Sequence, residues 1–228
     1  MDFYLDSANL DEICSVSWFP IRGVTTNPTI VAKENRPFLS LMEELIDLKL
    51  PQIHAQVLAD TTEEMVEEAK MLIRLSPGTI IPKIPVTPAG IHAIWRLAQD
   101  GYKITATGVF TVGQGLAAAK SGAQYIAPYI NRIDQTGQSG VSMACELKAA
   151  LETYNLPATI LAASVKTLYQ LKGLIEGGIQ GITVQADFLN QVVYHPLTEQ
   201  AVEGFTQDWL KTFALRTLDA PVKSRGKE

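Results

Sequence analysis

Short apolar runs alternate with amphipathic segments along the whole chain. The clearest amphipathic segment is 61–75, where Met65, Ala69, Leu72 and Ile73 recur at the period of a helix. A threonine followed by acidic residues opens this segment, which is typical of a helix N-terminus. Short apolar runs between helices are typical of buried parallel strands. The runs that predict strands are residues 3–7, 23–27, 52–59, 79–86, 103–110, 124–130, 159–164 and 181–185.

The number of predicted strands selects between two α/β architectures. Eight strands alternating with helices in 228 residues favour a closed (β/α)₈ barrel, that is, a TIM barrel. A doubly wound open sheet is the alternative, but it usually has fewer strands and often a glycine-rich first turn. The first turn here, "DSANLDE", contains no glycine. Further helices are predicted over 88–101, 141–155 and 166–178.

One more helix is predicted beyond the eighth strand, over residues 197–214. It carries Phe205, Trp209 and Phe213 at i, i+4 and i+8, an apolar stripe that needs a partner. We expect a single barrel domain over residues 1–221 that includes this C-terminal helix. Residues 222–228 are expected to form a mobile tail.

Composition and charge narrow the classes of partner and the compartment. Hydrophobic residues make up 46% and charged residues 19% of the chain, so a large core is available. The net charge is −5 and no basic run precedes the tail, so nucleic acid and membrane surfaces are poor candidate partners. Cys14 and Cys145 are too few for a disulfide framework or a zinc cluster. With no signal-peptide pattern and no apolar run of about 18 residues, we expect a cytoplasmic protein.

Polar residues gather where the predicted strands end. In a (β/α)₈ enzyme the chemistry lies at the C-terminal ends of the strands, and packing alone does not ask for polar groups there. Nearly every predicted strand supplies one. These residues are Asp6, Thr25, Thr26, Asn27, Gln56, Lys83, Thr107, Arg132 (just past Tyr129), Ser164 and Gln185.

Lys83 is the least expected of these residues, because it lies inside the apolar run "TIIPKIPV". Side chains alternate along a strand, so Ile81, Lys83 and Pro85 share one face, and that face points into the barrel if the other meets the helices. One interpretation is a structural ion pair with Asp6. The other is a lysine whose pKa is lowered by burial, so that its free amine can attack a carbonyl group and form a Schiff base.

Two prolines flank this lysine. Pro82 and Pro85 lack an N–H and have opposite parity, so each removes a ladder hydrogen bond on a different side of the strand. That composition is unusual for a central strand, and the simplest explanation is that the strand is short.

Several other residues invite a functional interpretation and are better explained by structure. His54 alternates with Gln56 and is expected to fill the barrel one layer deeper. His92 and His195 form no metal-ligand pattern. The "GQG" at 113–115 precedes a predicted helix, but alone it is a weak signal for phosphate binding.

The strand-end motifs together resemble those of one enzyme family. They are "FYLDSAN", "GVTTNPTI", "AQVLA", "KIPVTPAG", "TATGVF", "YIAPYINRID" and "LAASVKT". The chain resembles the small transaldolase / fructose-6-phosphate aldolase family of class I aldolases from end to end, and is most similar to the fructose-6-phosphate aldolase branch. Pro82 departs from the family pattern, in which a β-branched residue is expected before the lysine.

The resemblance implies a role for each candidate residue. Lys83 would form the Schiff base, and Asp6 and Asn27, with Thr26 beside them, would hold the dihydroxyacetone unit. Gln56, Thr107 and Tyr129 would hold a catalytic water, with Tyr129 serving the proton transfers. Arg132 and Ser164 would bind the phosphate of glyceraldehyde 3-phosphate. The alternative for Arg132 is a rim salt bridge with Asp134.

The resemblance also implies a (β/α)₈ fold, no metal and no organic cofactor. It implies a homo-oligomer built from rings, such as pentamers stacked into a decamer, in which the last helix reaches a neighbouring subunit. Transaldolases carry Glu and Phe at the positions of Gln56 and Tyr129. We therefore expect reversible cleavage of fructose 6-phosphate, with transaldolase activity as the first alternative. A barrel that has lost catalysis and serves in assembly is the second alternative.

Overall fold

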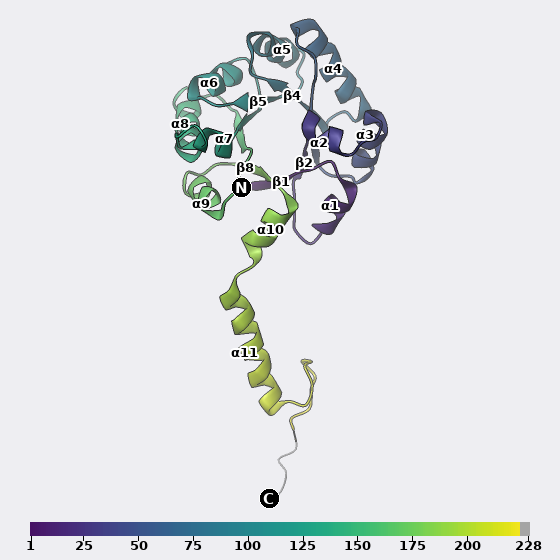
Figure 1. The fold of residues 1–228 in the computed structure, drawn as a ribbon, viewed down its shortest axis with the longest axis vertical. Helices are drawn as coiled ribbons and strands as arrows, with labels where there is room; N and C mark the ends of the chain where they lie inside the picture. Colours follow the sequence, from purple (N-terminus) through teal and green to yellow (C-terminus); the bar gives the residue numbers. More distant parts are fainter. Residues whose placement is uncertain (224–228) are drawn as a thin grey trace, which may run out of the picture. The chain divides into compact units, whose positions relative to one another are not determined.

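The chain folds around a closed barrel of eight parallel strands. The computed structural model describes residues 1–223, and the strands follow one another around the barrel in sequence order, with β8 pairing back onto β1. Figure 1 looks along this barrel and shows the strands inside a ring of helices. The predicted (β/α)₈ fold is confirmed. The strands are β1 (Asp2–Asp6), β2 (Gly23–Thr25), β3 (Gln52–Gln56), β4 (Ile80–Pro85), β5 (Thr105–Val109), β6 (Tyr125–Pro128), β7 (Thr159–Ala162) and β8 (Gly181–Val184).

The helices of the barrel mostly begin at a side chain that caps the first turn. Thr61, Thr87, Thr111 and Thr167, for example, each accept a hydrogen bond from a backbone N–H of the first turn, which satisfies one donor that the helix leaves free. The helices are α1 (Leu10–Ser15), α2 (Pro28–Lys33), α3 (Phe38–Asp47), α4 (Thr62–Leu75), α5 (Pro88–Gln99), α6 (Val112–Lys120), α7 (Ile130–Asp134), α8 (Gly140–Thr153), α9 (Leu168–Glu176) and α10 (Ala186–Val193).

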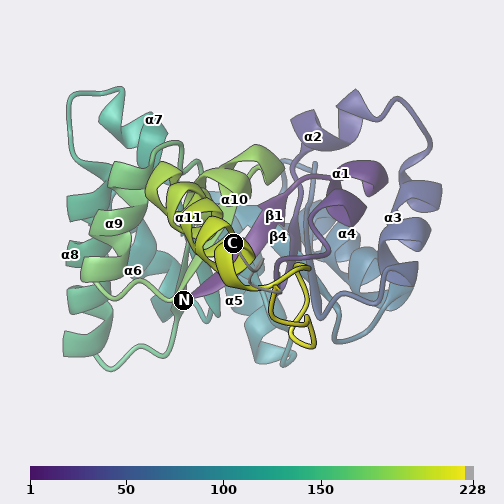
Figure 2. The same ribbon diagram turned by 90° about the horizontal axis from the view of Figure 1, so that it is seen from below.

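Two of these helices, α2 and α7, are short additions at the ends of β2 and β6. Figure 2 shows both at the same end of the barrel, opposite the N-terminus. Neither was predicted, because each is too short to show helical periodicity. The glycines at 113–115 lie within α6 instead of preceding a helix, so that detail of the prediction was wrong.

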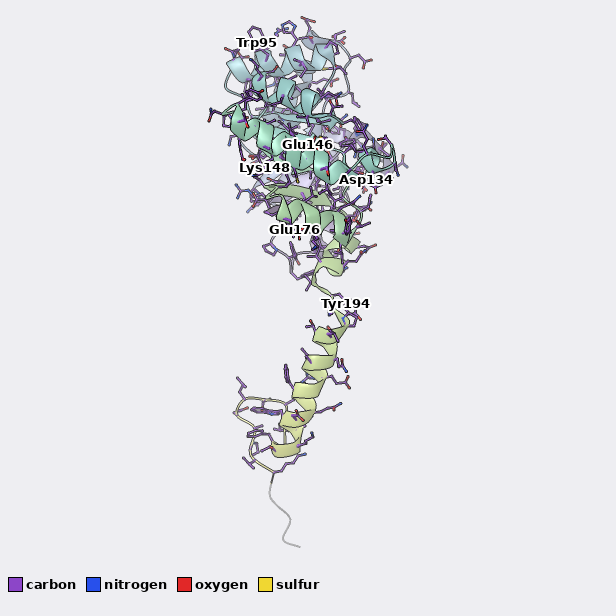
Figure 3. The ribbon with its side chains drawn as sticks, turned by 90° about the vertical axis from the view of Figure 1, so that its left-hand side faces the viewer. Trp95, Asp134, Glu146, Lys148, Glu176 and Tyr194 are labelled. Atoms are coloured by element: carbon purple, nitrogen blue, oxygen red, sulfur yellow. The ribbon has the colours of Figure 1, made fainter. Side chains whose placement is uncertain are left out.

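The helices turn their apolar faces to the strands and their charged faces outward. In α4 the buried residues are Thr62, Met65, Val66, Ala69 and Leu72, close to the predicted face. Figure 3 shows the outer side of the barrel, with Glu146 on α8 and Glu176 at the end of α9. The core therefore lies between the helices and the barrel wall and continues into the barrel interior.

The strand that carries Lys83 pairs along both of its edges despite its prolines. Gln56 of β3 and Thr105 of β5 are the register partners of Lys83. The strand has six residues, so the explanation that it is short does not hold. Hydrogen bonds continue past its end, where the N–H of Val86 donates to the Thr107 carbonyl (3.0 Å).

The layer of the barrel interior near the N-terminal ends of the strands is polar and aromatic. His54 is fully buried, with Nδ1 2.7 Å from Thr105 Oγ1 and Nε2 3.3 Å from Gln52 Oε1. Burial, followed by the charge of Lys83, lowers the pKa of His54 to about 3, so the imidazole is neutral at physiological pH. The rings of Tyr4 and Tyr125 meet it edge to face. His54 therefore fills the barrel.

The described chain divides into two compact units, Met1–Leu189 and a second that begins at Asn190, and each is described by itself. The second contains α11 (Pro196–Thr212), in the region where the terminal helix was predicted. Within this unit no residue of α11 is buried, and Phe205 is 72% exposed. Trp209 and Phe213 stack on each other at 4.1 Å between ring centroids. The single domain predicted over 1–221 stays a prediction, and residues 224–228 of the predicted tail lie outside the described residues.

Among the described residues, no helix combines the length and the apolar character needed to cross a bilayer.

Candidate active site

A cavity of about 290 Å³ lies where the strands of the barrel end. Its volume is close to the lower limit for small-molecule sites. Of the candidates from the sequence, Asp6, Asn27, Lys83, Tyr129, Arg132 and Ser164 line it. The other lining residues are Thr25, Thr105, Ala127, Asn131, Gln135, Leu161, Ala163, Lys166 and Thr183.

Lys83 lies in the inner part of this cavity and is 5% exposed. Its Nζ donates a hydrogen bond to the backbone carbonyl of Thr26 at 2.6 Å. Burial lowers the pKa of Lys83 from 10.5 to about 8, against the opposing effect of the Asp6 charge. Among the ion pairs of the described residues none includes Lys83, so the alternative of a structural ion pair with Asp6 was wrong. At a pKa of about 8, about a tenth of this lysine is the free amine at pH 7, far more than at the ordinary value of 10.5.

Asp6 ends a chain of hydroxyl groups that crosses three strands. The Thr25 hydroxyl donates to Asp6 Oδ1 at 2.8 Å, and Thr183 Oγ1 lies 2.6 Å from Thr25 Oγ1. Because the single proton of Thr25 is used on Asp6, Thr183 must be the donor in the second bond. The chain holds one oxygen of Asp6 and leaves the other for a ligand in the cavity.

Asn27 reaches the cavity from the first residue outside α2. Its side-chain oxygen caps the helix by accepting the N–H of Ile30 at 3.0 Å. The oxygen is therefore engaged, and the amide nitrogen is the group that Asn27 offers to the cavity. A donor at this place suits a hydroxyl or carbonyl oxygen of a substrate.

Tyr129 stands between the inner and outer parts of the cavity. Its hydroxyl lies 3.0 Å from Thr107 Oγ1, and either oxygen can be the donor. The Arg132 guanidinium carbon lies 4.7 Å from the centroid of the Tyr129 ring, in the range of a cation–π contact. Phe110 packs against the same ring, edge to face. One tyrosine thus places a hydroxyl toward Thr107 and supports the arginine with its ring.

The outer part of the cavity carries two cations. Arg132, on α7, is exposed and belongs to no ion pair of the described residues. Asp134 is not its partner, since Asp134 accepts hydrogen bonds from the Gly140 N–H (2.7 Å) and from Gln170 Nε2 (2.6 Å). The sequence interpretation of a rim salt bridge between Arg132 and Asp134 was therefore wrong. Lys166 is the second cation, and its Nζ donates to Gln185 Oε1 at 3.0 Å.

Ser164 lines the same cavity in an uncommon backbone conformation. Its φ is +58°, in the left-handed region that non-glycine residues rarely adopt. Its carbonyl accepts the N–H of Asn131 at 3.0 Å, so the turn after β7 is joined to α7. Uncommon backbone angles of this kind persist where the surroundings hold them and often occur at ligand sites.

Three of the candidates lie beside the cavity rather than in its wall. The Thr26 hydroxyl bonds to the His54 carbonyl at 3.4 Å, and its own carbonyl holds Lys83, so Thr25 takes the place in the wall that was expected for Thr26. Gln56 is half-buried and stands in register with Lys83 on the neighbouring strand. Thr107 is buried and contacts Tyr129.

Sequence reasoning did not single out Lys166, Asn131, Gln135, Thr105 or Thr183. The parity of β5 and β8 relative to Lys83 and Asp6 was a signal that could have found Thr105 and Thr183, because register partners on a barrel face the same side. Lys166 follows β7 by a few residues and has no such signal, since a loop has no fixed period.

Comparison with known proteins places this chain in a family. The family model for transaldolase/fructose-6-phosphate aldolase matches residues 3–221. The chain belongs to the transaldolase/fructose-6-phosphate aldolase family. The resemblance drawn from the strand-end motifs is thereby confirmed, and the protein is an enzyme with aldolase or transaldolase activity.

Relatives within the transaldolase/fructose-6-phosphate aldolase family carry both names. A probable transaldolase 2 of Listeria monocytogenes is 39% identical over 210 residues, covering 92% of this chain and 96% of the relative. A probable transaldolase of Heliobacterium modesticaldum is 38% identical, covering 92% and 97%. A probable fructose-6-phosphate aldolase of Streptococcus pneumoniae is 38% identical over 215 residues, covering 92% and 96%. These near-equal identities do not separate the two activities.

Proposed function

We propose that this enzyme is a Schiff-base aldolase that reversibly cleaves fructose 6-phosphate to dihydroxyacetone and glyceraldehyde 3-phosphate. The observation that carries the proposal is Lys83, a buried lysine in the cavity wall with a pKa lowered to about 8. A structural lysine would be paired with a carboxylate. Instead, Lys83 is held by a backbone carbonyl, which orients the amine without neutralising a charge.

The free amine of Lys83 adds to the C2 carbonyl of the sugar, and loss of water from the resulting carbinolamine gives an iminium ion. When the C4 hydroxyl gives up its proton, the C3–C4 bond breaks and its electron pair moves to the iminium nitrogen. Glyceraldehyde 3-phosphate leaves, and an enamine of dihydroxyacetone remains on Lys83. Protonation of C3 and addition of water then release dihydroxyacetone and restore the amine.

The two parts of the cavity suit the two ends of this substrate. The inner part offers the Asp6 carboxylate, the hydroxyl chain that holds it and the Asn27 amide, which suit the hydroxyls of the dihydroxyacetone unit. The outer part offers Arg132, Lys166 and Ser164, which suit a phosphate. A guanidinium that is supported by an aromatic ring and has no carboxylate partner among residues 1–223 is well prepared for bidentate phosphate contact.

Transaldolase activity is the second candidate, and Tyr129 is the observation that favours cleavage over transfer. A free aldolase must protonate the enamine and hydrolyse the imine quickly, whereas a transaldolase must protect the enamine until an acceptor binds. The Tyr129 hydroxyl lies 3.0 Å from Thr107 Oγ1, and this pair of hydroxyls supports a role in orienting a water and in these proton transfers. Gln56, in register with Lys83, adds no competing acid.

We also propose that the enzyme is a homo-oligomer in which α11 completes its packing against another subunit. The support is the apolar character of α11, on which no residue is buried within its own unit. Large exposed apolar residues such as Phe205 and Leu197 on one helix are typical of an interaction surface.

Reductive trapping tests the proposed function. Incubation with dihydroxyacetone and borohydride should inactivate the enzyme and add one triose to the peptide that contains Lys83, as seen by mass spectrometry. Lys83→Arg is the control and should be neither labelled nor active, because a guanidinium stays protonated. Chelation by EDTA should leave activity unchanged. Labelling of another lysine, or loss of activity with EDTA, would contradict the proposal.

A further inference from the structure

Gln170, in the first turn of α9, is a buried polar residue that makes four hydrogen bonds with its side-chain amide. It is 5% exposed. Its Oε1 accepts the backbone N–H groups of Lys166 (2.7 Å) and Thr167 (3.1 Å). Its Nε2 donates to Asp134 Oδ2 (2.6 Å) and Asn131 Oδ1 (3.3 Å). The oxygen thus holds the turn after β7, and the nitrogen holds α7.

Those two segments carry the residues proposed to bind phosphate. α7 contains Arg132, and the turn after β7 contains Ser164 and Lys166. They belong to different βα units, and apart from an isolated parallel bridge between Tyr129 and Ala163 neither is part of a strand ladder. Two backbone bonds from Ile130 and Asn131 join them at their inner ends, and Gln170 joins them further out.

A capping function alone does not explain why this residue is glutamine. Gln170 forms a capping box with Thr167, and in that motif glutamate serves as well, because only a side-chain acceptor is needed. The hydrogen bonds that Nε2 donates are not part of the capping box. One partner of Nε2 is the Asp134 carboxylate, so position 170 needs a donor there and an acceptor at the other end.

Both carboxylate oxygens of Asp134 accept hydrogen bonds in this arrangement. Its Oδ1 accepts the Gly140 N–H at 2.7 Å while Oδ2 accepts from Gln170. A Cβ on Gly140 would lie 2.3 Å from the Ile130 carbonyl oxygen, so only glycine permits this approach. Asp134, labelled in Figure 3, is the acid nearest to Arg132 along the chain. Held in this way, it leaves the Arg132 guanidinium free for an anion.

We infer that Gln170 is a positioning residue for the phosphate end of the site. Through Asp134 and Asn131 it holds α7, and through the N–H groups of the turn it holds Ser164 and Lys166, so that one phosphate is bound from both sides. This inference rests on the phosphate-binding role proposed above for the outer part of the cavity.

Gln170→Glu is the sharpest test, because it keeps the shape and the capping acceptor but places a carboxylate against Asp134. The assay is addition of dihydroxyacetone to D-glyceraldehyde 3-phosphate and, separately, to unphosphorylated D-glyceraldehyde. The KM for the phosphorylated acceptor should rise by about 10-fold to 10²-fold, the range for a displaced binding group. The KM for D-glyceraldehyde and the rate of borohydride trapping with dihydroxyacetone should stay within a few-fold.

Exchanging the carboxylate of position 134 with the amide of position 170 should restore the site. In Asp134→Asn combined with Gln170→Glu, the donor and the acceptor trade places, and the KM for the phosphorylated acceptor should return close to the wild-type value. Gln138→Glu, an exposed change of the same charge in the loop before α8, is the matched control and should have no effect. Asp134→Asn alone offers one oxygen to two donors and should raise the same KM by a few-fold, even if Gln170→Glu does not fold.

The outcomes separate this inference from the proposed function. A wild-type enzyme with no preference for the phosphorylated acceptor would contradict the proposed phosphate end, and the inference with it. A wild-type preference that Gln170→Glu and Asp134→Asn both retain would overturn the inference alone. The inference alone is also overturned if Gln170→Glu raises the KM for both acceptors equally, or if the double variant does not restore the KM for the phosphorylated acceptor. Gln170 would then be only a helix cap.

Discussion

The two ends of the cavity are built in different ways. At the inner end, Lys83, Asp6 and Thr25 stand on the barrel strands themselves, and Asn27 follows a strand directly. At the outer end, Arg132 stands on the short helix α7, and Ser164 and Lys166 stand on a turn. The inner groups are buried or half-buried, whereas Arg132 and Lys166 are exposed.

Different interactions position the side chains at the two ends of the cavity. The hydrogen bonds between the strands fix the positions of the inner side chains, so the geometry there depends on the barrel as a whole. The outer groups are held by a few hydrogen bonds, two of them between backbone groups and the others centred on Gln170 and Asp134. We therefore expect the inner end to be the more rigid of the two, and single substitutions to change acceptor preference mainly at the outer end.

The largest effect should come from removing the buried charge of the inner end. Because the pKa of Lys83 falls from 10.5 to about 8 on folding, unfolding takes up a proton between these two pH values. The cost of burial is therefore fully present below pH 8 and is lost as the pH rises toward 10.5. The shift corresponds to about 3 kcal/mol.

Urea unfolding of the wild type and Lys83→Met measures this cost. At pH 7 the variant should gain stability over the wild type, and the difference between the two proteins should shift by about 3 kcal/mol in favour of the wild type by pH 10.5. Lys172→Met, which alters an exposed lysine, is the control and should show no comparable trend. A difference that does not depend on pH would mean that Lys83 keeps its ordinary pKa in the folded protein.

Tyr129 contributes to both ends of the cavity, because its hydroxyl contacts Thr107 and its ring supports Arg132. A substitution can therefore remove one contribution and keep the other. Tyr129→Phe keeps the ring and removes the hydroxyl. Release of free dihydroxyacetone from fructose 6-phosphate should fall by about 10²-fold, the lower range for a positioned proton donor. Transfer to erythrose 4-phosphate should fall less, and the KM for phosphorylated substrates should change little.

The same assay decides between the two candidate activities. The wild type should release dihydroxyacetone faster than it transfers the unit to erythrose 4-phosphate. Efficient transfer with almost no release would make the enzyme a transaldolase.

The smallest effect should come from the outer end. Arg132→Gln removes a charge-assisted contact to phosphate but leaves Lys166 and Ser164 in place. We expect the KM for D-glyceraldehyde 3-phosphate to rise by about 10-fold, with unphosphorylated D-glyceraldehyde unaffected. An equal loss with both acceptors would show that Arg132 supports the inner end, through Tyr129, instead of binding phosphate.

The inner end could be predicted from the sequence because strands have a period. All eight strands were found from their apolar runs, and alternation around Lys83 was enough to point its side chain into the barrel. Thr26, Gln56 and Thr107 are exceptions, because they lie beside the cavity wall. For Thr26 the exact residue at which β2 ends decides whether position 25 or 26 faces the cavity. Boundaries of short strands are not encoded in periodicity.

The outer end could be predicted only in part, because its geometry depends on turns. Arg132 and Ser164 were identified from the family motifs. The sequence pattern does not predict that Ser164 adopts a positive φ or that Lys166 lines the cavity. Gln170 and Asp134 are far apart in sequence, and their contact depends on how α7 and α9 pack. Such tertiary contacts lie outside any local signal.

The hydrogen bond from Lys83 to the Thr26 carbonyl has a consequence for how the site can vary over evolution. The acceptor belongs to the main chain, so no substitution at position 26 removes it while β2 keeps its path. An alanine at position 26 would still anchor the amine, and mutational scanning would miss the contact altogether. The part of the site that orients the Lys83 amine is therefore inherited with the fold, and sequence divergence can reshape the rest of the cavity without disturbing it.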